Sequence, residues 1–194
     1  MKLVVGLGNV PEFRYAGTRH NVGFEVVEAI ARRHDVSWDS NDMSRQAVTG
    51  KWRRTPDPAV LVAKPQTLMN LSGDAVRQLM HFYRIAPTDL LIVCDDVNLP
   101  LGQLRARASG SEGGHKGLRS VAEQLATIDY ARLRVGVGRG DERRDLADHV
   151  LARFDPDEHA AAADAVMRAA DALELWITDG LAKVMNVYNQ RTAE

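Results

Sequence analysis

The sequence has little of what disulfide-linked, membrane-spanning and zinc-binding proteins need. It holds a single cysteine, Cys94, so no disulfide can form within the chain, and a reducing compartment fits that composition. No apolar run approaches the roughly 20 residues of a membrane helix. The N-terminus shows no basic-then-apolar signal pattern. The six histidines and the cysteine lack the paired spacing of a structural zinc site. We therefore expect a cytoplasmic protein without a metal.

Three common catalytic motifs are also missing. The sequence has no Walker-type Gly-Lys-Ser/Thr, and Gly6-x-Gly8 lacks the third glycine of a dinucleotide-binding turn, because Pro11 stands there. The spacing in Gly110–Gly113 differs from that of a nucleophile elbow. Cys94 lies inside an apolar run. Without a serine or cysteine nucleophile, direct attack by water is favoured over a covalent intermediate.

Charge is nearly balanced overall, but it is unevenly distributed. The formal net charge is −1, which by itself does not indicate a nucleic-acid partner. Residues 103–144 hold nine Lys/Arg and five Asp/Glu, whereas residues 145–180 hold two Arg and nine Asp/Glu. A basic middle section is compatible with a local phosphate-binding face, but charge alone favours an ordinary solvated surface.

Strand-like and helix-like patterns alternate along the 194 residues, of which 45% are hydrophobic. This favours an α/β fold, with a single domain over 1–194 and a mixed, mostly parallel sheet flanked by helices. We expect strands at 3–5, 46–52, 60–63, 90–94, 104–108 and 133–137. We expect helices at 21–34, 76–83, 116–125, 146–153, 157–177 and after Gly180. Residues 35–44 and 64–70 are expected to be irregular or loop, and 56–58 to form a turn.

The candidate site lies where predicted strands end. His20 follows the first strand and has the side chain whose unperturbed pKa is nearest neutrality. Asp95 follows a buried strand, and its carboxylate could fix one imidazole nitrogen so that the other deprotonates water. Asn9 and Asn70 stand at loop junctions, where amides can donate to an oxyanion. Taken alone, an asparagine at such a junction is usually a cap or turn residue, and an aspartate after a strand usually forms a turn.

A glycine-rich loop, 110–114, precedes the predicted helix at Lys116. Backbone N–H groups there, with Lys116 and Arg119, could hold a phosphate. A helix cap surrounded by solvated arginines is the alternative, and composition does not decide between them. The residues that could extend the binding surface along a nucleic-acid backbone are Arg105, Arg107 and Arg134.

Four segments, in this order and spacing, resemble bacterial peptidyl-tRNA hydrolases: GLGN…TRHNVGF, KPQTLMNLSG, DDVNLPLGQLR and GSEGGHKGLRS. The resemblance runs from Met1 to about Gln190. It implies a monomeric, cytoplasmic α/β enzyme with no cofactor. Such an enzyme cleaves the ester between a peptide and the 3′ ribose of tRNA, so its substrate is peptidyl-tRNA and it recycles tRNA from prematurely released chains.

The resemblance also implies roles for the residues in these segments. His20 would activate water and Asp95 would support it. Asn9 would help to distinguish blocked from free aminoacyl groups, and Asn70 would contact the substrate near the scissile ester. Of the remaining matched positions, Tyr15 and Leu68 would contact the tRNA end, Lys116 would bind substrate, and Arg105, Arg107 and Arg134 would lie on the acceptor-stem side.

Two departures from the family pattern are visible. One extra residue lies between Asn9 and His20, and the turn glycine after Asn9 is lost. Lys116 stands where asparagine is usual; lysine cannot accept a hydrogen bond but can donate to a carbonyl or phosphate. These changes suggest, as the alternative, a catalytically weak relative that acts as an RNA-binding factor. A generic carboxylesterase is a third hypothesis, and the missing nucleophile-elbow serine argues against it. The retained His20, Asp95, Asn9 and Asn70 favour the enzyme acting on peptidyl-tRNA.

Overall fold

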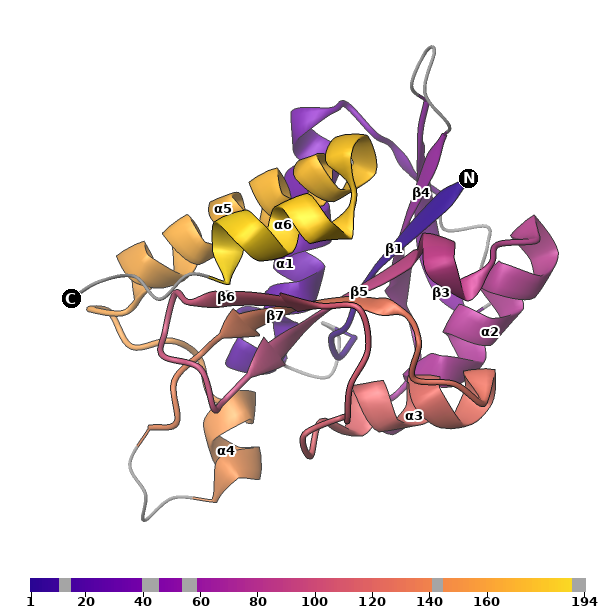
Figure 1. Cartoon of the computed structure of the whole chain (residues 1–194). Coiled ribbons are helices and arrows are strands. Elements are labelled where there is room, and N and C mark those ends of the chain that lie inside the picture. The colour runs from indigo at the N-terminus through magenta and orange to yellow at the C-terminus, as the bar shows by residue number, and fades with distance from the viewer. Residues whose placement is uncertain (11–14, 40–45, 54–58, 141–144, 190–194) are drawn as a thin grey trace.

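The structure is a computed structural model that describes residues 1–10, 15–39, 46–53, 59–140 and 145–189. The expected turn at 56–58 and the extra residue after Asn9, within 11–14, lie outside the described residues. Within them the chain forms a single α/β domain with a layer of helices on each face of a sheet (Figure 1).

The sheet has seven strands in the order β2-β3-β4-β1-β5-β7-β6 within the described residues. The central strands β4, β1, β5 and β7 are mutually parallel, whereas β2, β3 and β6 pair antiparallel at the two edges. The predicted mixed sheet is therefore confirmed. Strand bounds are β1 Lys2–Gly6, β2 Trp38–Asp39, β3 Ala47–Trp52, β4 Val60–Pro65, β5 Leu90–Asp96, β6 Leu104–Arg107 and β7 Ala131–Gly136.

Helices α1, α5 and α6 pack on one face of the sheet and α2 and α3 on the other, so two apolar cores lie on opposite sides of the same strands (Figure 1). Their bounds are α1 Val22–Arg33, α2 Ser72–Tyr83, α3 Lys116–Leu125, α4 Leu146–Leu151, α5 His159–Asp179 and α6 Leu181–Tyr188. Short 3-10 turns are η2 Arg19–Asn21, η4 Met69–Leu71 and η5 Pro87–Asp89. No described helix combines the length and apolar character needed to cross a bilayer.

Two segments differ from the sequence prediction. Trp38 and Asp39, expected to be irregular, form β2 because they pair with Gly50 and Thr49 of β3. Lys64 and Pro65, expected to begin a loop, extend β4 because their partners in β3 continue to Ala47. Proline is tolerated there because the pairing of β4 with β1 ends at Ala63, so that Pro65 lies at an edge of the sheet. In both segments the pairing with β3 overrides the local preference.

A close backbone approach places the start of α1 against the ends of β1 and β5. Gly6 ends β1, and a Cβ atom there would collide with the carbonyl oxygen of Gly23 in α1. A Cβ on Gly23 would lie 2.6 Å from the carbonyl oxygen of Val93 and would also collide with Leu7. This contact sets the position of η2, which immediately precedes α1 and carries His20. The glycines are therefore required by the packing that brings two strand ends and one helix together.

The substitution Gly23→Ala tests this contact. Although alanine favours helix, we expect the overpacking to lower the free energy of unfolding by about 1–3 kcal/mol. The measurement is urea denaturation followed by circular dichroism. Arg77→Ala, on the exposed side of α2, is the control and should change stability by less than about 0.5 kcal/mol. Equal stability of Gly23→Ala and the parent would show that the approach is looser than described.

Candidate active site

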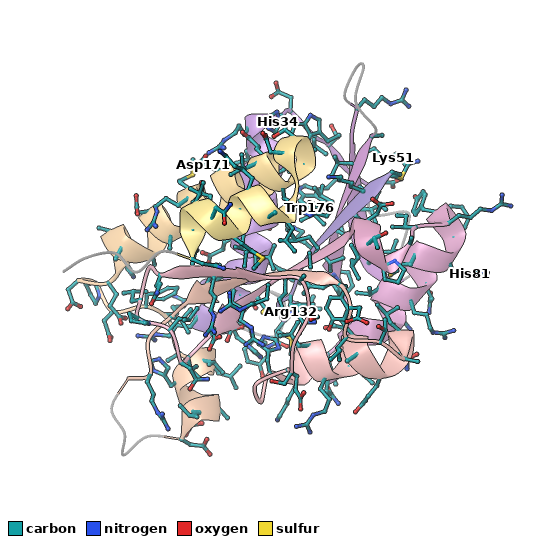
Figure 2. The ribbon with its side chains drawn as sticks, in the orientation of Figure 1. His34, Lys51, His81, Arg132, Asp171 and Trp176 are labelled. Carbon is teal, nitrogen blue, oxygen red and sulfur yellow. The ribbon has the colours of Figure 1, made fainter. Side chains whose placement is uncertain are left out.

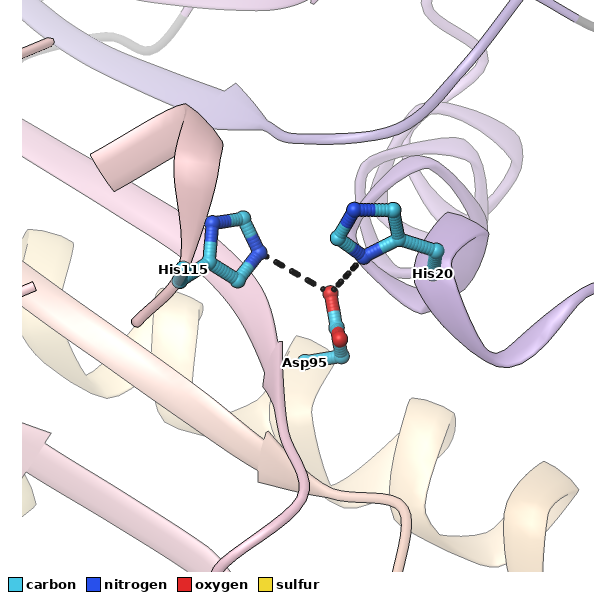
Figure 3. Close-up of side chains that lie close together, drawn as sticks. All are labelled: His20, Asp95 and His115. Carbon is cyan, nitrogen blue, oxygen red and sulfur yellow. Dashed lines mark hydrogen bonds and ion pairs between the residues drawn. The ribbon is translucent and has the colours of Figure 1, made fainter. Parts of the chain in front are cut away.

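The site is built around Asp95, which is buried near the end of the central strand β5. His20 of η2 lies beside it, with 2.7 Å between His20 Nδ1 and Asp95 Oδ1 (Figure 3). The contact expected from the sequence between two residues 75 positions apart is therefore present. It forms because β1 and β5 are adjacent parallel strands, so the segments that follow them meet at one edge of the sheet.

A second imidazole, which sequence reasoning did not include, contacts the same carboxylate oxygen. His115 Nε2 lies 3.0 Å from Asp95 Oδ1, on the other side of the oxygen from His20 (Figure 3). His115 also caps α3, because its Nδ1 accepts the backbone N–H groups of Gly117 at 3.1 Å and Leu118 at 3.2 Å. The one feature of the sequence that could have indicated His115 is its place after two glycines, where the loop meets the predicted helix.

These contacts determine where the hydrogens lie. Burial alone would raise the pKa of Asp95, but the neighbouring His115 and His20 outweigh it and hold the pKa well below its usual range. The group is therefore a carboxylate and can only accept, so both imidazoles donate to it. His20 carries its hydrogen on Nδ1, and in its neutral form Nε2 has a free lone pair. That lone pair can accept a proton from water.

The same reasoning argues against a metal centre at this position. Within the described residues, one set of three potential ligands comes within 4.8 Å: His20, Asp95 and His115. His115 Nδ1 accepts two backbone N–H groups, so the imidazole hydrogen stays on Nε2, the atom that faces Asp95. A histidine binds a metal through an unprotonated nitrogen. His115 is therefore a hydrogen-bond donor here and poorly suited as a ligand.

A pocket of about 870 Å³ opens beside this group, within the size range of ligand sites. Asn9 lines it and is held by Asn21, whose amide oxygen accepts the Asn9 backbone N–H at 2.7 Å and whose amide nitrogen donates to the Asn9 carbonyl at 2.9 Å. The structure brings most of the predicted site residues to this pocket. Those that line it are Asn9, Tyr15, His20, Leu68, Asn70, Asp95, Lys116 and Arg134.

The predicted basic residues divide into two groups. Arg105 and Arg107 are on the edge strand β6 and do not line the pocket; Arg105 is exposed and Arg107 half-buried. Arg134, opposite Arg105 on β7, is largely buried and pairs with Asp96 at 3.0 Å. Arg134 also donates to the carbonyl oxygen of Ser111 at 2.8 Å. Much of its donor capacity is thus used inside the protein.

A fourth arginine, not predicted from the sequence, supports the glycine-rich loop. Arg132 is 1% exposed, and it is labelled near the centre of Figure 2. It donates to the carbonyl oxygens of Gly110 at 2.5 Å and Ile128 at 2.7 Å. Cross-strand pairing places Arg132 opposite Arg107, so all four arginines of β6 and β7 face the same side of the sheet as α3.

Asp95→Asn tests the charge assignment. Because the folded pKa of Asp95 lies below its unfolded value, its ionised form stabilises the fold above a pH of about 4, and this contribution is lost as pH falls through the folded pKa. We expect the free energy of unfolding to drop less steeply below that pH in Asp95→Asn than in the parent, measured by urea titration at a series of pH values. The exposed Asp164→Asn is the control. An unchanged slope in Asp95→Asn would contradict a depressed pKa.

Comparison with known proteins identifies the family. A family model described as peptidyl-tRNA hydrolase matches residues 3–194. A peptidyl-tRNA hydrolase of Chloroflexus aurantiacus is 47% identical over 190 residues, covering 97% of this chain and 99% of the relative. One of Symbiobacterium thermophilum is 46% identical, covering 97% and 98%. The crystal structure of the Acinetobacter baumannii peptidyl-tRNA hydrolase superposes with a TM-score of 0.88 at 32% identity, covering 96% of this chain and 93% of that one. The chain therefore belongs to the peptidyl-tRNA hydrolase family.

Proposed function

We propose that this enzyme hydrolyses the ester of peptidyl-tRNA with water activated by His20. The observation that carries the mechanism is the carboxylate of Asp95, bonded at one oxygen by two imidazoles. It holds His20 with Nδ1 protonated, so that Nε2 acts as the base in the pocket that His20 lines. We further infer that the enzyme acts as a monomer in the cytoplasm and recycles tRNA.

In this mechanism the Nε2 atom of His20 takes a proton from water as the water oxygen bonds to the ester carbonyl carbon. The side-chain amides of Asn9 and Asn70, both at the pocket, are the candidate donors to the negatively charged oxygen of the tetrahedral intermediate. The intermediate then breaks its bond to the ribose 3′ oxygen, which receives the proton from the imidazolium. The products are a free peptide carboxyl group and tRNA.

His115 is a positioning residue in this mechanism. Its Nε2–H is fixed by the cap on α3, so it donates permanently to Asp95 and stabilises the ionised carboxylate. Because Asp95 is buried and already accepts the hydrogen bond from His115, its carboxylate is held in one orientation toward His20. Tyr15, Leu68 and Lys116 are proposed to contact the terminal nucleotide, and Leu68 is 56% exposed at the pocket. Lys116 would donate to a carbonyl or phosphate oxygen.

The alternatives to this enzyme are less well supported. An RNA-binding factor that has lost catalysis has no need of a base oriented by a buried carboxylate, and the curated relatives with 46–47% identity are named as hydrolases. A generic carboxylesterase would need a serine or cysteine nucleophile. Cys94 is fully buried, and burial raises the pKa of its thiol above the usual range. It is therefore not a candidate.

His20→Ala tests the proposed base. We expect kcat for release of labelled N-acetylamino acid from N-acetylaminoacyl-tRNA to fall by about 10²–10⁴-fold, the usual contribution of a general base. The control is His81→Ala, an exposed histidine of α2 that should leave kcat unchanged. Melting curves of both variants serve to check that they are folded. Activity of His20→Ala close to that of the parent would rule out this mechanism.

The tRNA-binding surface is tested by salt dependence. We propose that Arg105 and Arg107 contact backbone phosphates, so each change to glutamine should reduce the slope of log affinity against log salt by about 1 or less. Binding of uncharged tRNA is measured between low and high salt by fluorescence anisotropy. Arg32→Gln, exposed on α1 across the sheet, is the control and should leave the slope unchanged. If both the Arg105 and Arg107 variants kept the salt slope of the parent, these arginines would not contact the tRNA phosphates.

A further inference from the structure

Arg19, the residue before His20, is an almost fully buried arginine at a junction between two segments. Its side chain is 4% exposed. Its Nη1 donates to the carbonyl oxygen of Arg153 at 2.5 Å, and its Nη2 forms an ion pair with the carboxylate of Glu158. Asp155 lies 3.6 Å from the same nitrogen. All of these partners belong to the connection between α4 and α5.

The backbone joins the same two segments. Thr18 and Arg153 form an isolated antiparallel bridge, and the Arg19 N–H donates to the carbonyl oxygen of Ala152 at 3.0 Å. Glu158 is further fixed because it accepts the Asp155 N–H at 2.8 Å. The bonds of Arg19 therefore connect the turn that carries His20 to the end of α4.

Helix α4 forms one wall of the pocket, and it stands apart from the other helices at the lower edge of Figure 1. Four of its six residues line the pocket: Leu146, Ala147, Val150 and Leu151. Leu146 and Leu151 are still about two-fifths exposed, at 40% and 37%. The helix packs chiefly against η2. Its position therefore depends on that contact more than on a core.

The two sides of this junction are held unequally. The turn η2 has independent bonds to the sheet side of the site, through His20 to Asp95 of β5 and through Asn21 to Asn9, which follows β1. Among the described residues, one side-chain hydrogen bond joins α4 itself to the rest of the domain: His149 Nε2 donates to the carbonyl oxygen of Gly138, at 3.0 Å. Loss of the Arg19 side-chain contacts would leave α4 held by His149 and by the backbone bonds, and would therefore loosen α4 while leaving His20 on Asp95.

We propose that Arg19 is a positioning residue that holds α4 against the pocket and so sets the affinity for the substrate. This rests on the proposed function, because the substrate is taken to bind in the pocket that His20 and α4 share. In the proposed mechanism His20 activates the water that attacks the ester carbonyl, so the acyl group and the ribose 3′ oxygen lie nearest His20. The wall formed by α4 would then act on binding and not on the proton transfer itself.

Glu158→Ala removes the ion pair without touching the turn that carries His20. We expect KM for N-acetylaminoacyl-tRNA to rise about tenfold and kcat to stay within about threefold of the parent, the pattern of lost binding with unaltered chemistry. Amide hydrogen exchange in residues 146–151 and at Arg19, whose N–H is bonded to Ala152, should become faster, while exchange at Asn21, whose N–H is bonded within the turn, should not change. Arg19→Lys, which keeps the charge but loses the planar fork, should give the same split.

A reversible crosslink distinguishes this role from general destabilisation. Thr18 and Arg153 are an antiparallel pair, whose Cα separation is within the range that a disulfide spans. In Glu158→Ala carrying Thr18→Cys and Arg153→Cys, KM should be high when reduced and return to within about threefold of the parent when oxidised. The buried Cys94 does not compete for the bond.

Glu174→Ala is the matched control, because Glu174 pairs with Arg33 and His34 and joins α5 to α1 away from the pocket. It should lower the melting temperature without raising KM. The proposal is overturned by a folded Glu158→Ala variant with the parent KM, by a raised KM that oxidation does not reduce, or by a fall in kcat with KM unchanged. Failure of the proposed function would instead appear as activity that survives His20→Ala.

Discussion

One buried carboxylate organises this site. Asp95 is removed from solvent, and desolvation would favour its neutral form, yet two imidazole N–H groups keep it ionised. Because one of those groups, on His115, is itself fixed by the N-terminus of α3, the carboxylate is oriented before any substrate arrives. A preoriented acceptor costs no reorganisation during the reaction. This arrangement determines that Nδ1 of His20 carries the hydrogen and that Nε2 is the nitrogen free to accept a proton.

The surrounding fold can be understood as the means of bringing three segments to that carboxylate. Parallel pairing of β1 and β5 aligns the ends of the strands, and the close approach of Gly6 and Gly23 lets α1 begin directly over them. On the other side, Arg132 holds the loop before α3 by its carbonyl oxygens. A larger residue at Gly6 or Gly23, or the loss of the Arg132 side chain, would shift His20 or His115 away from Asp95.

The acidic part of the chain, which composition alone left without a role, is partly explained by its partners. Asp155 and Glu158, before α5, face Arg19 beside the pocket, whereas Asp171 and Glu174 of α5 face Arg33 at the end of α1. These carboxylates are paired with arginines of the same chain, at partly or largely exposed positions for all except Arg19. On β6, by contrast, Arg105 is exposed and Arg107 half-buried, so positive charge remains accessible at this edge of the sheet. Near-neutral net charge and a basic face are therefore compatible.

The sequence by itself determined the class of fold and most elements, because apolar periodicity is a local signal. It also indicated the contact between His20 and Asp95, because the carboxyl ends of the strands of such a sheet meet at one edge. The resemblance in four segments supplied the family. Only the tertiary structure revealed His115 as the second partner of Asp95 and showed that Arg134 and Arg132 face inward. A sequence names donors and acceptors, but which of them share one oxygen, and which charges are already paired, depends on packing between segments far apart in the chain.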